Sequence, residues 1–214
     1  MKGRHPLGRV ATLWRYPVKS LAPESLRTAR VGLAGFEGDR QTALFVDSPD
    51  GPRSGKTYRG KEHNLLHTVA TPERAIELAA ERKVAVGARN AGPYFDAAAV
   101  SLVFDAWIAD LERLAGRALE PQRFRPNLFV VAEPGFALAE ADLLGATLSL
   151  GEVTLEVVEP INRCVTTSYD LENGESDPRM LRTLVQERNN TMGIYCSVKT
   201  AGTVARGDTL WQER

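Results

Sequence analysis

Short runs of β-forming residues, each closed by glycine, proline or another turn residue, recur along most of this chain of 214 residues. The runs are 10–16, 26–31, 40–47, 127–132, 146–150, 153–159, 194–198 and 204–211. Runs of this length between turn signals predict strands. Gly151-Glu152, between two of the runs, is typical of a hairpin. We therefore expect a mainly β (α+β) fold of barrel-like architecture with a few short helices.

The predicted helices are three segments with helical spacing or capping signals. They are 72–82, 101–115 and 181–187. Thr71 and Asp177 are candidate N-caps, because each precedes a proline that suits the first helical position. Gly116 is expected to end the second helix. The remaining predictions are loops at 48–64 and 87–95 and a short strand at 83–86.

The overall charge argues against a nucleic-acid or membrane partner. Lysine and arginine total 27 and aspartate and glutamate also total 27, so the formal net charge is zero. Nucleic-acid-binding domains usually carry a basic excess. The sequence contains no run near the roughly 18 apolar residues of a membrane span and no apolar leader. We expect a cytoplasmic protein.

Cysteine and histidine usage limits the kinds of metal site. The two cysteines, Cys164 and Cys196, do not make a disulfide framework and are expected to be reduced thiols. They lack the CxxC spacing of a zinc site, and His63 and His67 form only a weak pair.

Four short polar segments lie at predicted strand ends or in loops: 15–20 (RYPVKS), 38–40 (GDR), 123–127 (RFRPN) and 162–167 (NRCVTT). Each has a purely structural explanation when taken alone. Lys19 is explained as a solvated strand end, Arg40 as a surface ion-pair residue, and the arginines of 123–127 as flanks of a connection. Cys164 is explained as a small buried apolar residue.

The combination points to an anion pocket beside a thiol. Three of the four segments place a cation at a strand end, where sheets and barrels build sites. Lysine and arginine with serine and asparagine are a usual set for holding phosphate. Arg163 beside Cys164 favours the thiolate, the form that binds metals or attacks electrophiles. A soft thiolate near such a pocket suits a metal held by a phosphorylated organic cofactor. These residues do not identify the metal.

The same segments resemble the signatures of the MOSC domain superfamily with its N-terminal MOSC β-barrel domain. This group includes the mitochondrial amidoxime-reducing components and bacterial relatives. The matching stretches run in order through almost the whole chain: YPVKS at 16–20, GDR at 38–40, RFRPN at 123–127, RCxxTxxD at 163–170, GxYxxV at 193–198 and GxxxxGD at 202–208. The resemblance implies a trimmed N-terminal β-rich lobe over 1–95 and a MOSC β-barrel domain over 96–214.

The resemblance also implies a molybdenum cofactor of the pyranopterin (molybdopterin) type and, at the level of the family, pyridoxal phosphate binding. Cys164 would be the metal ligand and the catalytic residue. The residues implied around the cofactor and its phosphate are Lys19, Ser20, Arg40, Arg125, Asn127 and Arg163. Asp105 is expected to face the metal, in a stretch where the family often has Thr-x-x-Ser. Cys196 replaces an ordinary apolar residue and is expected in the core.

Three functions follow from the resemblance. The first is a molybdenum-dependent reductase of N-hydroxylated compounds, or a related oxotransferase, which takes a small-molecule substrate and electrons from an external donor protein. The second is a cofactor carrier or sulfur-transfer protein without turnover of its own. The third is a scaffold that has lost the cofactor, which the retention of Lys19, Arg40, Arg125 and Cys164 argues against.

Overall fold

Seven strands close into a barrel within the residues that the structure, a computed structural model, describes (3–48 and 52–213). Their order is β13-β9-β10-β11-β7-β8-β1, and pairing of β13 with β1 completes the circle. These strands are β1 (Arg4–Arg15), β7 (Val100–Phe104), β8 (Leu128–Ala132), β9 (Thr147–Leu150), β10 (Val153–Asn162), β11 (Thr191–Thr200) and β13 (Thr209–Glu213). Neighbours are antiparallel except β7 and β8, which are parallel. The mainly β, barrel-type prediction is confirmed.

Alternating side chains explain why these segments form a barrel wall. In β10, Val153, Leu155 and Val157 are buried, whereas the residues between them are partly exposed. One face of the strand therefore packs in the barrel interior and the other lies outside. The register between β10 and β11 shifts after Val157, so the strand bends before it reaches Asn162. This bend carries the chain toward the segment that contains Cys164.

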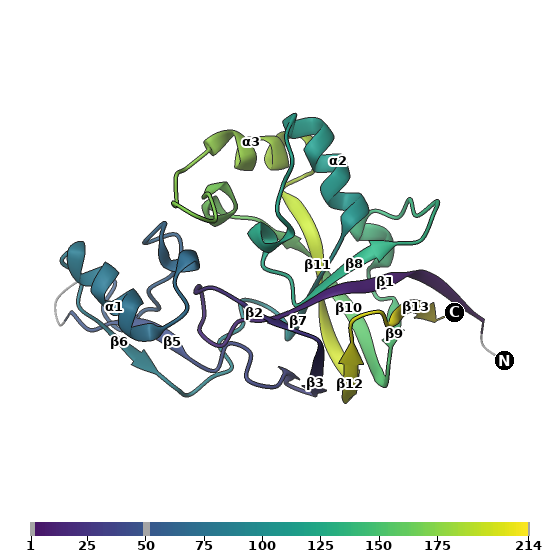
Figure 1. Cartoon of the computed structure of the whole chain (residues 1–214), viewed down its shortest axis with the longest axis horizontal. Coiled ribbons are helices and arrows are strands. Elements are labelled where there is room, and N and C mark those ends of the chain that lie inside the picture. The colour runs from purple at the N-terminus through teal and green to yellow at the C-terminus, as the bar shows by residue number, and fades with distance from the viewer. Residues whose placement is uncertain (1–2, 49–51, 214) are drawn as a thin grey trace.

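A smaller lobe lies beside the barrel and has its own hydrophobic core (Figure 1). It contains the hairpin-like pair β5 (Ala43–Val46) and β6 (Val86–Arg89), the helix α1 (Pro72–Glu81) and the single turn η1 (Leu66–Thr68). Leu21, Leu44 and Leu66 are fully buried in this core. The division of the chain at residue 95 remains a prediction, and the N-terminal strand β1 is part of the barrel.

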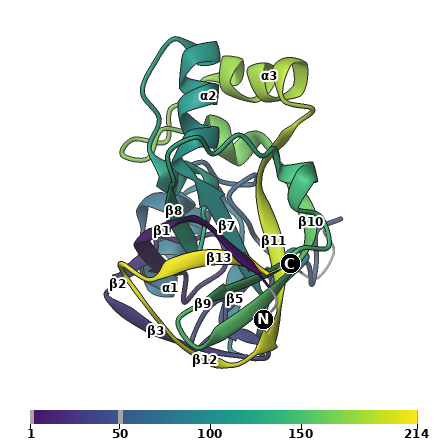
Figure 2. The ribbon, with the colours of Figure 1, turned by 90° about the vertical axis from the view of Figure 1, so that its right-hand side faces the viewer.

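Two helices cover one end of the barrel, α2 (Asp105–Ala115) and α3 (Pro178–Glu187) (Figures 1 and 2). The remaining strands are β2 (Glu24–Leu26), which pairs with β1, and β3 (Thr28–Gly32), β4 (Gly35–Phe36) and β12 (Gly202–Ala205), which form a separate sheet. The four single-turn helices are η1, η2 (Pro121–Phe124), η3 (Glu140–Leu143) and η4 (Val165–Ser168). No helix in the described part of the chain is long and apolar enough to cross a membrane.

One helix prediction was wrong in its first half. Residues 101–115 were expected to be helical, but Val100–Phe104 is the barrel strand β7, and the helix begins only at Asp105. All five residues of β7 are buried. In a short run that is almost entirely apolar, some apolar residues fall at helical spacing whether or not the segment is a helix, so the spacing did not distinguish a strand from a helix here. The predicted end at Gly116 is confirmed, because Gly116 adopts a left-handed φ of 69°.

Local capping explains the other helices. The Thr71 side chain accepts a hydrogen bond from the Arg74 amide, and the Asp177 side chain accepts one from the Arg179 amide, which confirms both caps.

The strand predicted at 83–86 begins three residues later than expected, because Lys83 has a φ of 58° and turns the chain first. The predicted strands 26–31 and 204–211 are each divided in two. The segment 48–64 was predicted as a loop, and the structure has no strand or helix over 52–64. Residues 49–51 of that segment lie outside the described residues.

Candidate functional site

A cavity of about 500 Å³ lies between the barrel and the smaller lobe. Its lining comes from both. The smaller lobe and the segments that join it to the barrel contribute Lys19, Ser20, Arg40, Arg59, Gly60, Lys61, His67 and Asp96, and the barrel side contributes Ser101, Arg123, Arg125, Arg163, Cys164, Thr166 and Tyr195. Seven of these side chains are lysine or arginine and one is a carboxylate, so the cavity favours an anion.

Cys164 lies at the start of the short turn η4 and its side chain is exposed to the cavity. The Sγ atom is 3.1 Å from Oγ1 of Thr166. The loop is anchored from behind by Arg123, a buried residue whose guanidinium donates hydrogen bonds of 3.1 Å and 2.6 Å to the carbonyls of Thr167 and Tyr169. The sulfur is therefore accessible while the backbone that carries it is held in place.

Arg163 does not bond to the neighbouring sulfur. Its Nε donates to the Met192 carbonyl at 2.8 Å and a terminal nitrogen donates to the Phe124 carbonyl at 2.9 Å. Burial lowers the pKa of Arg163 to about 10. Its guanidinium ties the cysteine loop to β11 and to the segment before β8, and it adds positive charge to the cavity wall.

Arg125 is the strongest candidate for holding an anion. It has a left-handed φ of 50°, and its guanidinium carbon lies 4.2 Å from the centre of the Tyr16 ring. One terminal nitrogen is buried and has no hydrogen-bond partner among the described residues. Burial lowers the pKa of Arg125, because the charge is desolvated. A buried guanidinium nitrogen without a partner costs free energy unless an oxyanion binds it.

Arg40 lies on the same tyrosine, with its guanidinium 4.9 Å from the Tyr16 ring centre. It forms an ion pair with Asp39, which is completely buried. Burial would lower the pKa of Arg40, but the Asp39 carboxylate outweighs it and raises the pKa. Asp39 also accepts a 2.7 Å hydrogen bond from the Tyr16 amide. Arg40 therefore already has a counter-ion, unlike Arg125.

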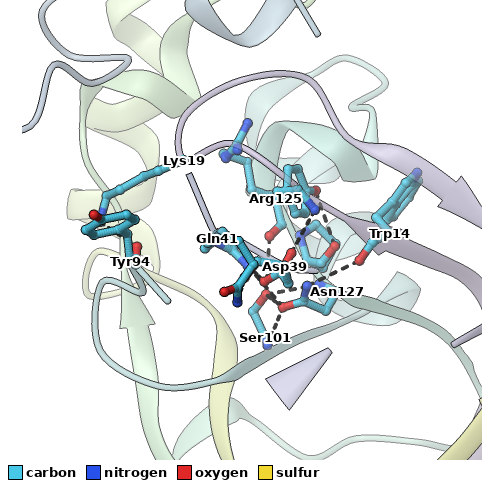
Figure 3. Close-up of polar contacts among 11 residues, drawn as sticks. Trp14, Lys19, Asp39, Gln41, Tyr94, Ser101, Arg125 and Asn127 are labelled. Carbon is cyan, nitrogen blue, oxygen red and sulfur yellow. Dashed lines mark hydrogen bonds and ion pairs between the residues drawn. The ribbon is translucent and has the colours of Figure 1, made fainter. Parts of the chain in front are cut away.

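Asn127 supports the site from within the barrel wall and does not line the cavity. Its side chain donates to the Trp14 carbonyl at 3.2 Å and accepts from the Ser101 amide at 3.1 Å (Figure 3). Its Oδ1 atom also lies 3.5 Å from a terminal nitrogen of Arg40. We conclude that Asn127 links β1, β7 and β8 under the site and orients its neighbours.

Lys19 and Ser20, which the resemblance implies near the cofactor, both line the cavity. Lys19 donates to Oδ1 of Asp96 at 2.6 Å and to the Tyr94 carbonyl at 3.0 Å. Figure 3 shows it directed toward Tyr94. Burial would raise the pKa of Asp96, but the hydrogen bond and charge of Lys19, together with the charges of Arg40 and Arg125, outweigh it and lower the pKa. Ser20 has a left-handed φ of 72° where the chain turns into the smaller lobe.

The structure places Asp105 elsewhere, so the expectation that it faces the metal site is not supported. Its Oδ1 accepts hydrogen bonds from the amides of Ala106 and Ala132, at 2.7 and 2.8 Å, and it borders a separate hollow along α2. None of residues 104–107 lines the cavity that contains Cys164. Cys196 is buried in the barrel core, as predicted, and burial raises its pKa to about 12.

The cavity residues that were not predicted from the sequence include Arg59, Lys61, His67 and Tyr195. The first three lie in or just after the polar segment that was predicted only as a loop, and their lysine, arginine and histidine side chains were the available signal. Tyr195 is part of the GxYxxV stretch that had been noted without a role. Burial raises the pKa of Tyr195, so its hydroxyl stays protonated at neutral pH.

Protein side chains alone do not make a metal centre here. Within residues 3–48 and 52–213, no three His, Cys, Asp or Glu side chains are grouped so that they could hold a metal ion. A metal at Cys164 therefore needs further ligand atoms from an organic cofactor. The partnerless nitrogen of Arg125 is suited to bind an anionic group of such a cofactor.

Two family models match the chain. The MOSC domain matches residues 81–211 and the MOSC N-terminal beta barrel domain matches residues 7–89. This chain belongs to the MOSC domain family. MOSC domains are associated with the molybdenum cofactor, which agrees with a thiol beside an anion pocket.

The chain is also similar to one curated protein and to several solved structures, and it spans less than half the length of the curated relative. The chain is 27% identical over 132 residues to mitochondrial amidoxime reducing component 2 of Bos taurus. The aligned region covers 56% of this chain and 38% of that relative. The crystal structure of the YuaD protein from Bacillus subtilis covers 100% of this chain and 98% of its own, with a TM-score of 0.61 and 16% identity. The crystal structure of YiiM from Escherichia coli aligns over 98% of this chain and 69% of its own, with a TM-score of 0.48 and 13% identity.

Proposed function

We propose that this MOSC protein binds a molybdenum cofactor in the cavity, with Cys164 as the protein ligand to the metal, and reduces N-hydroxylated compounds or catalyses a related oxygen-atom transfer. One observation carries the proposal. The exposed sulfur of Cys164 shares a cavity with Arg125, whose guanidinium has a buried nitrogen with no partner among the described residues. A soft metal ligand and an oxyanion site therefore occur together.

The division of roles follows from the contacts. Arg125 would bind the phosphate of the cofactor, and Arg40, which contacts the same Tyr16 ring, would add positive charge nearby. Lys19 and Ser20 would complete the polar wall. When bound, the cofactor would supply two-electron redox chemistry at the metal. The resemblance to amidoxime reducing component 2 supports reduction of an N-hydroxylated substrate, and the electrons would come from an external donor protein.

Tyr195 is a candidate proton donor in the cavity. Reductive cleavage of an N–OH bond consumes two electrons and two protons and releases water. The Tyr195 side chain lines the cavity and keeps its proton, because burial raises its pKa. A protonated phenol can donate a hydrogen bond to the departing hydroxyl. Arg163 cannot take this role, since its nitrogens are directed to carbonyls.

Metal analysis tests the cofactor assignment. Wild type, Cys164→Ala and Cys196→Ala are produced in a molybdenum-replete host and their molybdenum per chain is measured. We expect molybdenum in wild type and in Cys196→Ala, the matched cysteine control, and little in Cys164→Ala. Equal molybdenum in Cys164→Ala would remove the ligand role, and wild type without molybdenum would contradict the cofactor assignment.

Turnover separates an enzyme from a carrier. Dithionite-reduced protein that contains molybdenum is mixed with an N-hydroxyamidine, and the amidine formed is measured. We expect product above the Cys164→Ala background. Molybdenum that is bound without turnover would support the second function, a cofactor carrier or sulfur-transfer protein.

A further inference from the structure

The segment Arg59-Gly60-Lys61 of the smaller lobe lies against the cysteine loop. A methyl group added at Gly60 would be 2.9 Å from Cγ2 of Thr166, so the Thr166 side chain would have to shift to admit it. The hydroxyl of that same Thr166 is 3.1 Å from Sγ of Cys164. The glycine therefore allows this segment to lie close to the Thr166 side chain, and Arg59 and Lys61 flank the contact in the sequence.

These two cations are not used by the site described above. Both line the cavity. Arg59 contacts Glu62, which also forms an ion pair with Arg53, so a single carboxylate serves two guanidinium groups. Lys61 is exposed and makes no ion pair or hydrogen bond with any side chain or carbonyl in the described ranges. The rim of the cavity beside Cys164 therefore has a net positive charge that no protein group neutralises.

Position divides the cations of the cavity into two sets. Arg125 and Arg163 are half-buried in the wall on the barrel side, whereas Lys61 is exposed at the side formed by the smaller lobe. The half-buried pair is available to a cofactor that is held permanently. Lys61 is in contact with solvent and meets a molecule that enters from solution.

We propose that Arg59 and Lys61 select substrates that carry an oxyanion, a carboxylate or a phosphate, close to the group that reacts at Cys164. This inference rests on the proposed function for the identity of the reaction, but the charge selection at the sulfur can be measured without turnover. A unit charge within several ångströms of a partly exposed site changes the local concentration of an anion about three- to tenfold.

Alkylation of Cys164 tests the selection in the full chain produced without molybdate. Iodoacetate and iodoacetamide are nearly the same size, and only the first is an anion. In both reactions the thiolate attacks the CH₂ carbon, a C–S bond forms and iodide leaves. Cys196 is buried, and Cys164→Ala provides the background rate. The readout is the ratio of the iodoacetate rate to the iodoacetamide rate.

The matched control is Lys56→Gln, because Lys56 is an exposed lysine in the same segment that does not line the cavity. We expect the rate ratio to fall about three- to tenfold in Lys61→Gln and to stay near the wild-type value in Lys56→Gln. The difference should shrink at high salt. Equal ratios in the two variants would overturn the proposal.

Kinetics then connect the charge to the substrate. For a neutral N-hydroxyamidine and its carboxylate-bearing analogue, Lys61→Gln should raise the KM of the carboxylate compound about three- to tenfold more than that of the neutral one. If Lys61→Gln instead lowers molybdenum content, these cations hold the cofactor and the substrate assignment is wrong. A changed alkylation ratio without any turnover would support anion selection while contradicting the proposed reductase.

Discussion

The guanidinium carbon of Arg125 lies 4.2 Å from the centre of the Tyr16 ring, and the Tyr16 hydroxyl donates a 3.2 Å hydrogen bond to the carbonyl of Pro126. The tyrosine thus supports both the charged side chain and the backbone that carries it. Tyr16 is fully buried, and a cation over a desolvated ring is stabilised by about 2 kcal/mol.

Replacement of Tyr16 separates these two contributions. Tyr16→Phe keeps the ring and loses one hydrogen bond, so it should cost about 1 kcal/mol of stability and keep the cofactor. Tyr16→Leu also removes the ring that orients Arg125, and should lower the molybdenum content, as we also expect of Arg125→Met, which removes the guanidinium itself. Equal molybdenum in the Phe and Leu variants would show that the ring does not position Arg125.

The buried ion pair between Asp39 and Arg40 should be essential for the stability of the site. Asp39→Ala leaves the Arg40 charge without its counter-ion and the Tyr16 amide without its acceptor. Removing one partner of a buried pair costs about 3–5 kcal/mol. Urea unfolding measures the loss. Asp39→Asn keeps an acceptor for the amide, so it should be less destabilising than Asp39→Ala, and the reverse order would contradict this account.

Arg123 should control the order of the cysteine loop. Arg123→Met leaves the carbonyls of Thr167 and Tyr169 without their donor in a buried setting, at a cost of about 2–3 kcal/mol. Hydrogen exchange over residues 164–170 should accelerate. Arg179→Met, at an exposed arginine on α3, is the matched control and should leave exchange in this loop as it is in wild type.

Stability should fall steeply in alkali because Tyr16 and Cys196 hold their protons in the folded state. Burial raises both pKa values to about 12, from ordinary values of 10.0 and 9.0. A raised folded pKa gives stability that is complete below the unfolded pKa and is lost as pH rises toward the folded pKa. For Cys196 this window runs from pH 9 to pH 12, with about 1.4 kcal/mol lost per pH unit.

Cys196→Ala isolates that contribution. The variant should be less stable than wild type at pH 7, because a buried side chain has been shortened, and the difference should narrow above pH 9. Urea unfolding at several pH values gives the two curves. Parallel curves from pH 7 to pH 11 would show that the thiol does not titrate on unfolding.

The sequence was sufficient for features that depend on local chemistry. Thr71 and Asp177 could be identified as helix caps, and Cys164 and Arg125 as site residues, because each lies in a short distinctive motif. Strand β7 was missed, since its unbroken apolar run fits either kind of element until its neighbours in the barrel are known.

The missed site residues have a different cause. Lys61 and His67 reach the cavity only because the smaller lobe packs against the cysteine loop, where Gly60 contacts Thr166. Gly60 and Thr166 are about a hundred positions apart, and no local sequence pattern predicts a contact between them. The sequence motifs also do not distinguish residues that line the cavity from those that support it, and Asn127 is of the second kind.

Asp105 provides the last test, because the structure removes it from the site. Its carboxylate accepts hydrogen bonds from the amides of Ala106 and Ala132, and so joins the start of α2 to the end of β8. Asp105→Ala leaves both amides without this acceptor and should cost about 1–3 kcal/mol of stability, measured by urea unfolding. Molybdenum per folded chain should equal that of wild type, since the side chain borders the hollow along α2 and not the cavity that contains Cys164. Loss of molybdenum from folded Asp105→Ala would return Asp105 to the cofactor site and contradict this placement.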